Sequence, residues 1–188
     1  GSGMSGIIIS HDATGNRVLR NYVGTNPDET IAMPNYKGIA LATGVNKNLV
    51  GGNIIAFNEY QGVHIDPNAN ENNLEGNRIF GNGSEGIYLA GQDNVIGGPN
   101  ENYRNMINGP AGGIVIAPDG TGNLIEHNFI GTDETGTKDL AEGDFDGVQI
   151  GGSNNVVRDN LILGYGGDGI DISSWSTSTV IPENNIVE

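Results

Sequence analysis

Residues 62–89 read GVHIDPNANENNLEGNRIFGNGSEGIYL, and this stretch contains the repeating unit of the whole chain. It opens and closes on a tetrapeptide of the form glycine, aliphatic, any residue, aliphatic. A second phrase, Asn-x-aliphatic-x-x-Asn-x-Ile, lies between the two copies. The tetrapeptide recurs at intervals of 22 to 34 residues and starts at Gly6, Gly38, Gly62, Gly86, Gly113, Gly147 and Gly169. A two-part phrase at so many places indicates a repeat architecture.

Each repeat holds three short runs in which aliphatic residues alternate with other side chains, separated by glycine or asparagine. Period-two alternation is typical of strands with one face turned inward, and the runs are too short for an amphipathic helix. The sequence therefore predicts an all-β fold, a right-handed parallel β-helix (solenoid) of about seven coils with three short strands per coil. Each coil would bury its aliphatic residues against the neighbouring coils.

The second asparagine of the phrase is predicted to form a column along the rod. An inward amide at a corner can bond backbone groups that the bend leaves unpaired, and it can bond the asparagine one coil away. The predicted column consists of Asn21, Asn53, Asn77, Asn105, Asn128, Asn160 and Asn184.

The composition limits the classes of partner. The formal charge is −15, which argues against nucleic acid and anionic membrane surfaces. Polyanionic sugars would be repelled unless a divalent cation such as Ca²⁺ bridges them. The chain has no cysteine and no apolar run of about 20 residues, which excludes disulfides, thiol chemistry and insertion of a helix into a membrane.

The chain is predicted to form one domain. Residues 1–4 look like an expression scar, and residues 5–188 should form a single parallel β-helix. Because no capping helix is visible at either end, we expect a segment of a longer protein, with adjacent coils or a second copy against the end coils. Two long excursions, residues 24–36 and 131–145, leave their coils at the same corner and should project on one side of the rod.

Two segments carry a family resemblance. IGTDETGT, which starts at Ile130, and GNRIFGNGSEGIYL, which starts at Gly76, resemble the repeats of bacterial right-handed parallel β-helix proteins of the pectin-lyase-like superfold. Such repeats occur in secreted polysaccharide lyases, hydrolases and epimerases, and in large surface proteins with no known reaction. The resemblance therefore implies an extracellular or cell-surface location, and fold alone does not choose between catalysis and binding.

Carboxylates gather in the last two coils. Asp146 and Asp168 each precede the glycine of a tetrapeptide, so adjacent coils should place them about 5 Å apart. Together with Asp144 they could hold Ca²⁺, and together with Asp171 they could act as catalytic acids; the alternative is a set of solvated turn residues. GDGIDI at 167–172 resembles the Asp-bearing strand of polygalacturonases, whose Asp-Asp pair, His-Gly segment and basic motif are missing here.

Three ring side chains are candidates for sugar contact. His64 and Tyr88 occupy the outward position of adjacent Gly-aliphatic strands, and Asp66 beside His64 could help it act as a general base. Trp175 is the only tryptophan and follows the seventh such strand, where it could stack on a sugar ring or fold over the last coil as a partial lid. The alternative for His64 is an ordinary surface histidine.

The residue after each column asparagine should point outward, yet this stripe is mostly apolar. It reads Tyr22, Ile54, Arg78, Met106, Phe129 and Leu161. An exposed apolar stripe indicates that another part of the protein or a partner covers it. We expect the inserted loops to cover it, with self-association of the protein as the alternative.

Taken together, these features favour a non-catalytic extracellular β-helix scaffold or surface module that contacts polysaccharide. The alternative is a polysaccharide-active enzyme, a hydrolase, lyase or epimerase, acting at Asp146, Asp168 and Asp171 or at His64. No cofactor is expected other than Ca²⁺.

Overall fold

The computed structural model describes residues 4–141, 143–175 and 178–188. Within these residues the chain forms three parallel sheets and one short 3₁₀ helix, η1 (Glu101–Tyr103). No helix in these ranges is long and apolar enough to cross a membrane. Of the predicted expression scar, residues 1–3 lie outside the described residues.

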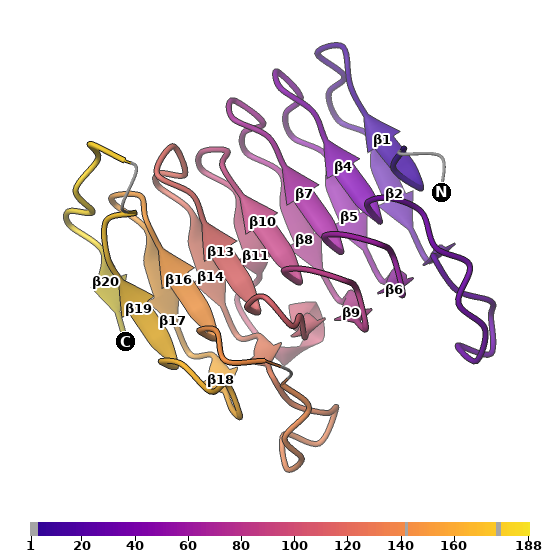
Figure 1. Ribbon diagram of the computed structural model, residues 1–188. Helices are drawn as coiled ribbons and strands as arrows, with labels where there is room; N and C mark the ends of the chain where they lie inside the picture. Colours follow the sequence, from indigo (N-terminus) through magenta and orange to yellow (C-terminus); the bar gives the residue numbers. More distant parts are fainter. Residues whose placement is uncertain (1–3, 142, 176–177) are drawn as a thin grey trace.

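The strands of successive coils stack on one another in each sheet (Figure 1). The first sheet comprises β1 (Ile7–Ile9), β4 (Ile39–Leu41), β7 (Val63–Ile65), β10 (Ile87–Leu89), β13 (Ile114–Ile116), β16 (Val148–Ile150) and β19 (Ile170–Ile172). The second sheet comprises β2 (Arg17–Leu19), β5 (Leu49–Gly51), β8 (Asn73–Glu75), β11 (Val95–Gly97), β14 (Leu124–Glu126), β17 (Val156–Arg158) and β20 (Ile186–Val187). The third sheet comprises β3 (Tyr22–Val23), β6 (Ile54–Ala56), β9 (Arg78–Phe80), β12 (Met106–Ile107), β15 (Phe129–Ile130) and β18 (Leu161–Ile162).

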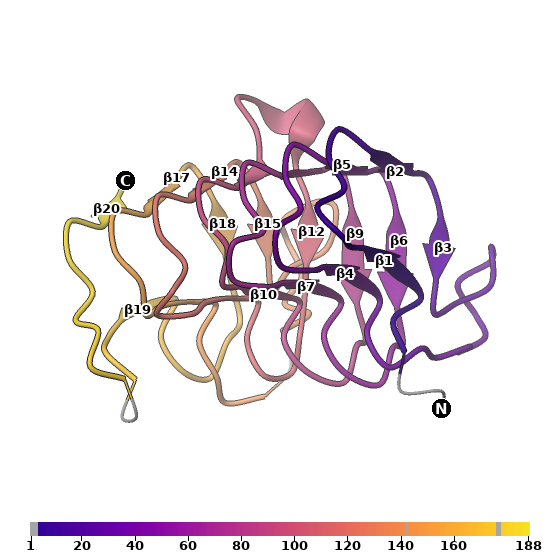
Figure 2. The ribbon, with the colours of Figure 1, turned by 90° about the horizontal axis from the view of Figure 1, so that it is seen from above.

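The predicted fold is confirmed, because every strand pair is parallel and the repeat phrases align in register. Ile87 of β10, for example, pairs with Val63 of β7 and with Ile114 of β13. Figure 2 shows the strands of the first and second sheets along two sides of the rod, with the third sheet between them. The described chain makes six full coils, and a seventh contributes strands only to the first and second sheets.

The interior of the rod is a continuous file of aliphatic side chains. The fully buried residues include Ile39, Leu41, Ile65, Leu89 and Ile116. They come from the inward positions of short strands, and the same position of the next coil covers each of them. The hydrophobic effect therefore acts between neighbouring coils, as expected for a solenoid.

Buried asparagines form the predicted column beside this core. The Nδ2 atom of Asn53 donates to the Oδ1 atom of Asn77 at 3.0 Å, and Asn77 repeats this donation to Asn105 at 2.9 Å. Each Oδ1 also accepts the backbone N–H of the preceding coil. The amides thus pair backbone groups that the corner would leave unpaired.

The end of the column was predicted wrongly. Asn185, not Asn184, is hydrogen-bonded in a ladder, and it accepts from the backbone N–H of Asn155 at 2.8 Å. Ile186 correspondingly pairs with Val156 of the second sheet. The connection after β19 is longer than the repeat phrase predicts. As a result, the residues that were predicted to form a strand of the third sheet form a strand of the second sheet instead.

There are further asparagine ladders that the sequence analysis did not single out. The first asparagine of the phrase forms a second ladder, in which Asn72 donates to Asn94 at 3.0 Å. A third ladder follows the third sheet, and it runs from Asn35 through Asn58 to Asn82. Amides thus line three corners of the coil.

Both inserted loops form small hairpins that project from the same edge of the rod (Figure 1). Thr25 pairs with Ala32 in the first loop and Thr132 pairs with Asp139 in the second, both antiparallel. In each loop one side-chain oxygen closes the turn: the Oδ1 atom of Asn26 accepts from two backbone N–H groups, and that of Asp133 accepts from three. Their projection on one side is as predicted.

Candidate functional site

A row of three rings lies on the outer surface of the first sheet. His64 of β7 pairs in register with Tyr88 of β10, and their rings stack with centroids 4.9 Å apart and planes 8° from parallel. Trp175 lies on the other side of Tyr88, with ring centroids 6.5 Å apart and planes at 56°. We call these three side chains the aromatic row.

Two features of local structure build the row. His64 and Tyr88 are the middle residues of their strands, so period-two alternation turns them outward while their neighbours fill the core. Trp175 follows β19 and reaches back over the sheet toward Gly151. A Cβ on Gly151 would lie only 2.8 Å from the indole Nε1 atom, so the indole fits because this residue is glycine.

Polar groups surround the rings. The Nε2 atom of His64 lies 2.9 Å from the Oδ1 atom of Asp66. Glu85, in the turn before β10, accepts hydrogen bonds from Gln61 at 3.1 Å and from Ser84 at 2.6 Å. The row thus combines apolar ring surface with carboxylates that are held in place.

The environment of the row shifts the pKa of both of its titratable rings. Burial lowers the pKa of His64 below its usual range, and the positive charge of Lys37 lowers it further, while Asp66 and Glu85 act in the opposite direction. Burial raises the pKa of Tyr88, and Glu85 adds to this effect. At neutral pH both rings are therefore uncharged.

Polar ring atoms of His64 and Trp175 are turned away from solvent. His64 faces Asp66 through Nε2, whereas its Nδ1 atom is buried and has no hydrogen-bond partner in the described chain. The Nε1 atom of Trp175 is likewise buried and unpartnered among these residues. His64 and Trp175 thus present mainly carbon surface to the outside.

The acidic residues of the last coils lie on adjacent coils, as their spacing predicts. Their side chains accept hydrogen bonds from groups in the turns. The Oδ1 atom of Asp146 accepts the backbone N–H of Asp168 at 2.8 Å, and Asp171 accepts from the hydroxyl of Ser173. Asp144 lies against Gly166 of the next coil. In the part of the chain that the structure describes, no three acidic or imidazole side chains converge to hold a metal ion.

The apolar stripe runs along the third sheet in the predicted register, from Tyr22 of β3 to Leu161 of β18. The prediction that the inserted loops cover it is confirmed at two places. Glu29 of the first loop makes a 2.7 Å ion pair with Arg78, and Gly136 of the second loop packs over Phe129 and Leu161. The first loop thus reaches from its own coil across to β9.

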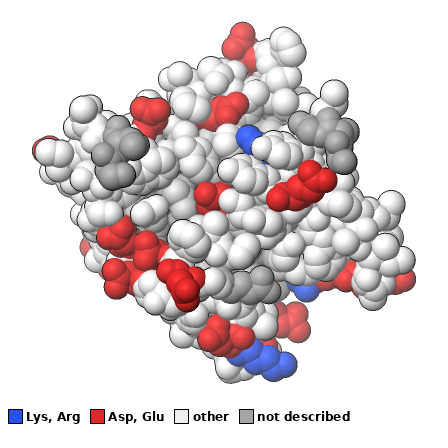
Figure 3. All heavy atoms as spheres, in the orientation of Figure 1, with Lys and Arg blue, Asp and Glu red and all other residues white. Residues whose placement is uncertain are grey.

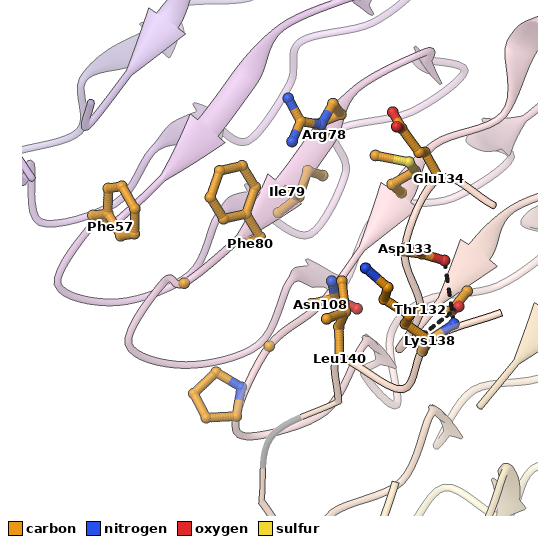
Figure 4. Close-up of a pocket in the computed structure, with 14 residues that line it drawn as sticks. Phe57, Arg78, Ile79, Phe80, Asn108, Thr132, Asp133, Glu134, Lys138 and Leu140 are labelled. Carbon is orange, nitrogen blue, oxygen red and sulfur yellow. Dashed lines mark hydrogen bonds between the residues drawn. The ribbon is translucent and has the colours of Figure 1, made fainter. Parts of the chain in front are cut away.

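A pocket of about 500 Å³ opens on the third sheet, where the second loop overhangs β9 and β12 (Figure 4). Phe57 and Phe80 form an edge-to-face pair on its wall, with ring centroids 5.6 Å apart. Asn108, Thr132 and Leu140 also line it. Sequence reasoning missed this pocket because its walls come from four coils and from an insertion whose course no spacing fixes.

Comparison with known proteins supports the fold. Two crystal structures of the periplasmic alginate epimerase AlgG resemble this chain. A point mutant of AlgG has a TM-score of 0.60 and 18% sequence identity over 98% of this chain, and AlgG itself has a TM-score of 0.57 and 18% identity over 97%. In both cases the match covers 42% of the AlgG chain, so the present chain spans less than half of that protein.

No curated protein sequence matches this chain. The family model described as the right-handed β-helix region matches residues 1–141, which is about three quarters of the sequence. That match agrees with the parallel ladders, the buried amides and the aliphatic interior described above. The chain therefore belongs to the right-handed β-helix family.

Proposed function

We propose that this β-helix is a non-catalytic polysaccharide-binding module that contacts a glycan chain through the aromatic row. The observation that carries the proposal is the row itself: three rings follow one another along the outer surface of the sheet, and buried polar atoms of His64 and Trp175 are turned inward. Sugar rings have apolar C–H faces that stack on aromatic carbon, and a polysaccharide offers such faces at regular intervals. The alginate epimerase activity of AlgG, which has a similar fold, is in keeping with a glycan partner.

The charge of the surroundings narrows the class of glycan. The face of the rod that carries the first sheet shows scattered carboxylates and few cations (Figure 3). Carboxylates such as Asp66 and Glu85 accept hydrogen bonds from sugar hydroxyls, whereas they repel uronate groups. We therefore propose a neutral glycan; a polyanionic one would need a divalent cation as a bridge.

A rigid rod with a sugar-binding face suits the outside of a cell. We propose an extracellular, cell-surface or periplasmic location, in keeping with the periplasmic location of the alginate epimerase AlgG. There the stacked coils would act as a spacer between other parts of a longer protein, or as a unit that associates through its end coils.

A glycan array tests the proposal, run once with Ca²⁺ and once with chelator. We expect binding to neutral polysaccharides in both conditions, and loss of at least tenfold in affinity in Trp175→Ala and in Tyr88→Ala. Tyr22→Ala is the matched control, because this half-exposed ring lies on the third sheet, away from the row. Unchanged affinity in both row variants would exclude the row as the contact.

Catalysis is the second candidate function, and one observation favours it. His64 and Asp66 form a 2.9 Å pair, and a histidine with a lowered pKa is neutral at pH 7, which a general base requires. Against it, the unpaired Nδ1 atom is buried and cannot reach a sugar unless the ring turns.

Alginate incubated with the protein in D₂O separates the two functions. A base that removes a carbon-bound proton would exchange it for deuterium, which NMR detects in the polymer. The binding module predicts no exchange above the buffer blank. Exchange that disappears in His64→Gln would establish the enzyme instead.

A further inference from the structure

We propose that the pocket on the third sheet is a second sugar site, specific for an N-acetylated amino sugar. It lies on a different sheet from the aromatic row and does not depend on it. Its volume of about 500 Å³ falls in the range of small-molecule sites. It also has a preformed frame, since the ladder below it and the hairpin above it are both hydrogen-bonded.

The walls of the pocket are mainly apolar. Phe57 and Phe80 form one side, and Met106, Pro110 and Leu140 contribute carbon surface on the others. Leu140 is nearly half exposed, like most of the hairpin to which it belongs. Such a surface suits the face of a sugar ring or a methyl group.

The charges of the lining cancel. Arg78 and Lys138 are its two cations, and Asp133 and Glu134 are its two anions. Arg78 is also held by Glu29 and lies over the ring of Phe80, at 5.3 Å from its centroid. A pocket without net charge selects a neutral ligand and not a uronate or a phosphate.

Two polar atoms of the lining residues have no partner in the described chain. One is the Oδ1 atom of Asn108, a residue that is only 8% exposed, and the other is the Nε atom of Arg78. Asn108 follows Ile107, which pairs with Ile79, so it lies beside Phe80 and is not a member of the third ladder; its amide oxygen accepts no hydrogen bond from the described residues. Both atoms are buried within the lining of the pocket, whose two residues Figure 4 labels, so one acceptor and one donor there lack a partner among the described residues.

An acetamido group matches this pair. Its N–H can donate to Asn108, its carbonyl can accept from Arg78, and its methyl group fits the apolar wall beside them. The terminal torsions of both side chains are soft, so small rotations suffice to present the buried atoms to the ligand. A sugar without the acetamido group would leave both polar atoms unpaired, which is a strong basis for discrimination.

Two disaccharides test the inference by NMR titration of the ¹⁵N-labelled protein. N,N′-diacetylchitobiose carries acetamido groups, and cellobiose has the same linkage without them. We expect chitobiose to shift the amide signals of the second inserted loop and of Asn108, and cellobiose to leave them unchanged. Equal shifts from both sugars, or no shift at the pocket from chitobiose, would overturn the proposal.

Two variants locate the binding. Asn108→Leu removes the acceptor and should weaken chitobiose binding at least tenfold, and Leu140→Ala, on the exposed hairpin, should weaken it a few-fold without touching a ladder. Tyr22→Ala is the control on the same sheet. Full affinity in both pocket variants would overturn the site, and so would shifts confined to the aromatic row, a result that would at the same time support the first site.

Discussion

The first and third sheets come from the same repeat, yet they present different surfaces to the outside. On the first sheet the outward positions of neighbouring strands bring His64 and Tyr88 into a stack that no inserted loop covers. On the third sheet the outward stripe is equally apolar, but two hairpins fold over it and leave a pocket. The comparison shows that the repeated coil places side chains in columns on each sheet. Loops inserted at one corner then determine whether a column stays exposed on the surface or becomes part of a pocket.

The largest effect is expected from the interior that both faces share. Asn77→Ala removes an amide that accepts from two groups and donates to two, and stranded backbone groups should cost about 2 kcal/mol. This predicts a fall in Tm of roughly 4–8 °C, measured by circular dichroism.

Asn16→Ala is the matched control for Asn77→Ala, since Asn16 is an exposed member of a ladder at the first coil. It should cost clearly less. Equal losses for the two variants would contradict a stabilising role of the buried amides and leave the aliphatic file as the main source of stability.

The next effect separates the two faces. Gly151→Val places side-chain atoms where the indole of Trp175 now packs, and it should displace that ring from the aromatic row. Because Trp175 is the only tryptophan, its fluorescence emission reports the displacement directly. Glycan affinity at the first sheet should fall about tenfold, and chitobiose binding at the pocket should not change.

Gly76→Val is a control for Gly151→Val at a glycine where a Cβ would make only ordinary contacts with the backbone of Gly52 but φ is positive. It should lower stability without altering the emission. An unchanged emission in Gly151→Val would show that the indole does not rest on this glycine.

A smaller effect should appear at the third sheet. Glu29→Gln breaks the ion pair with Arg78, and because both side chains are partly exposed we expect a loss of only about 0.5 kcal/mol. Hydrogen exchange should nevertheless speed up in residues 25–32, since this contact ties the first loop to β9. Exchange equal to that of the wild type would show that the hairpin is held by its own turn.

The smallest predicted effect is a dependence of stability on pH. His64 has a lowered pKa in the folded protein, so the unfolded chain takes up a proton first as the pH falls through its usual value of about 6.5. The contribution of neutral His64 is thus complete above that pH and declines below it. The wild type should lose more Tm than His64→Gln between pH 7.5 and 5.5, and parallel losses would contradict the burial of this ring.

The sequence was sufficient for the fold and for much of the open face. Glycine and aliphatic residues at a recurring spacing fixed the parallel register, and register alone brings His64 beside Tyr88. It was not sufficient for the Trp175 contact, which depends on a connection that crosses several coils, nor for Asn185, which a longer last turn shifts into a ladder.

The pocket on the third sheet could not be predicted from the sequence. Phe57 directly follows β6 and Phe80 is the last residue of β9, at positions that the phrase does not specify, and the turn of the hairpin above them is closed by the side chain of Asp133. Nothing in the spacing predicts that the amide oxygen of Asn108 has no partner among the described residues. Columns of side chains can be predicted from the repeat in the sequence. A site that forms where the repeat is interrupted can be found only in the three-dimensional structure.

The central claim, that the aromatic row is the glycan contact, is tested most directly by an NMR titration with the polysaccharide fragment that the array selects. We predict that the indole N–H signal of Trp175 and the side-chain signals of His64 and Tyr88 shift together along one binding curve. Shifts that spare all three rings while the fragment still binds would contradict the claim.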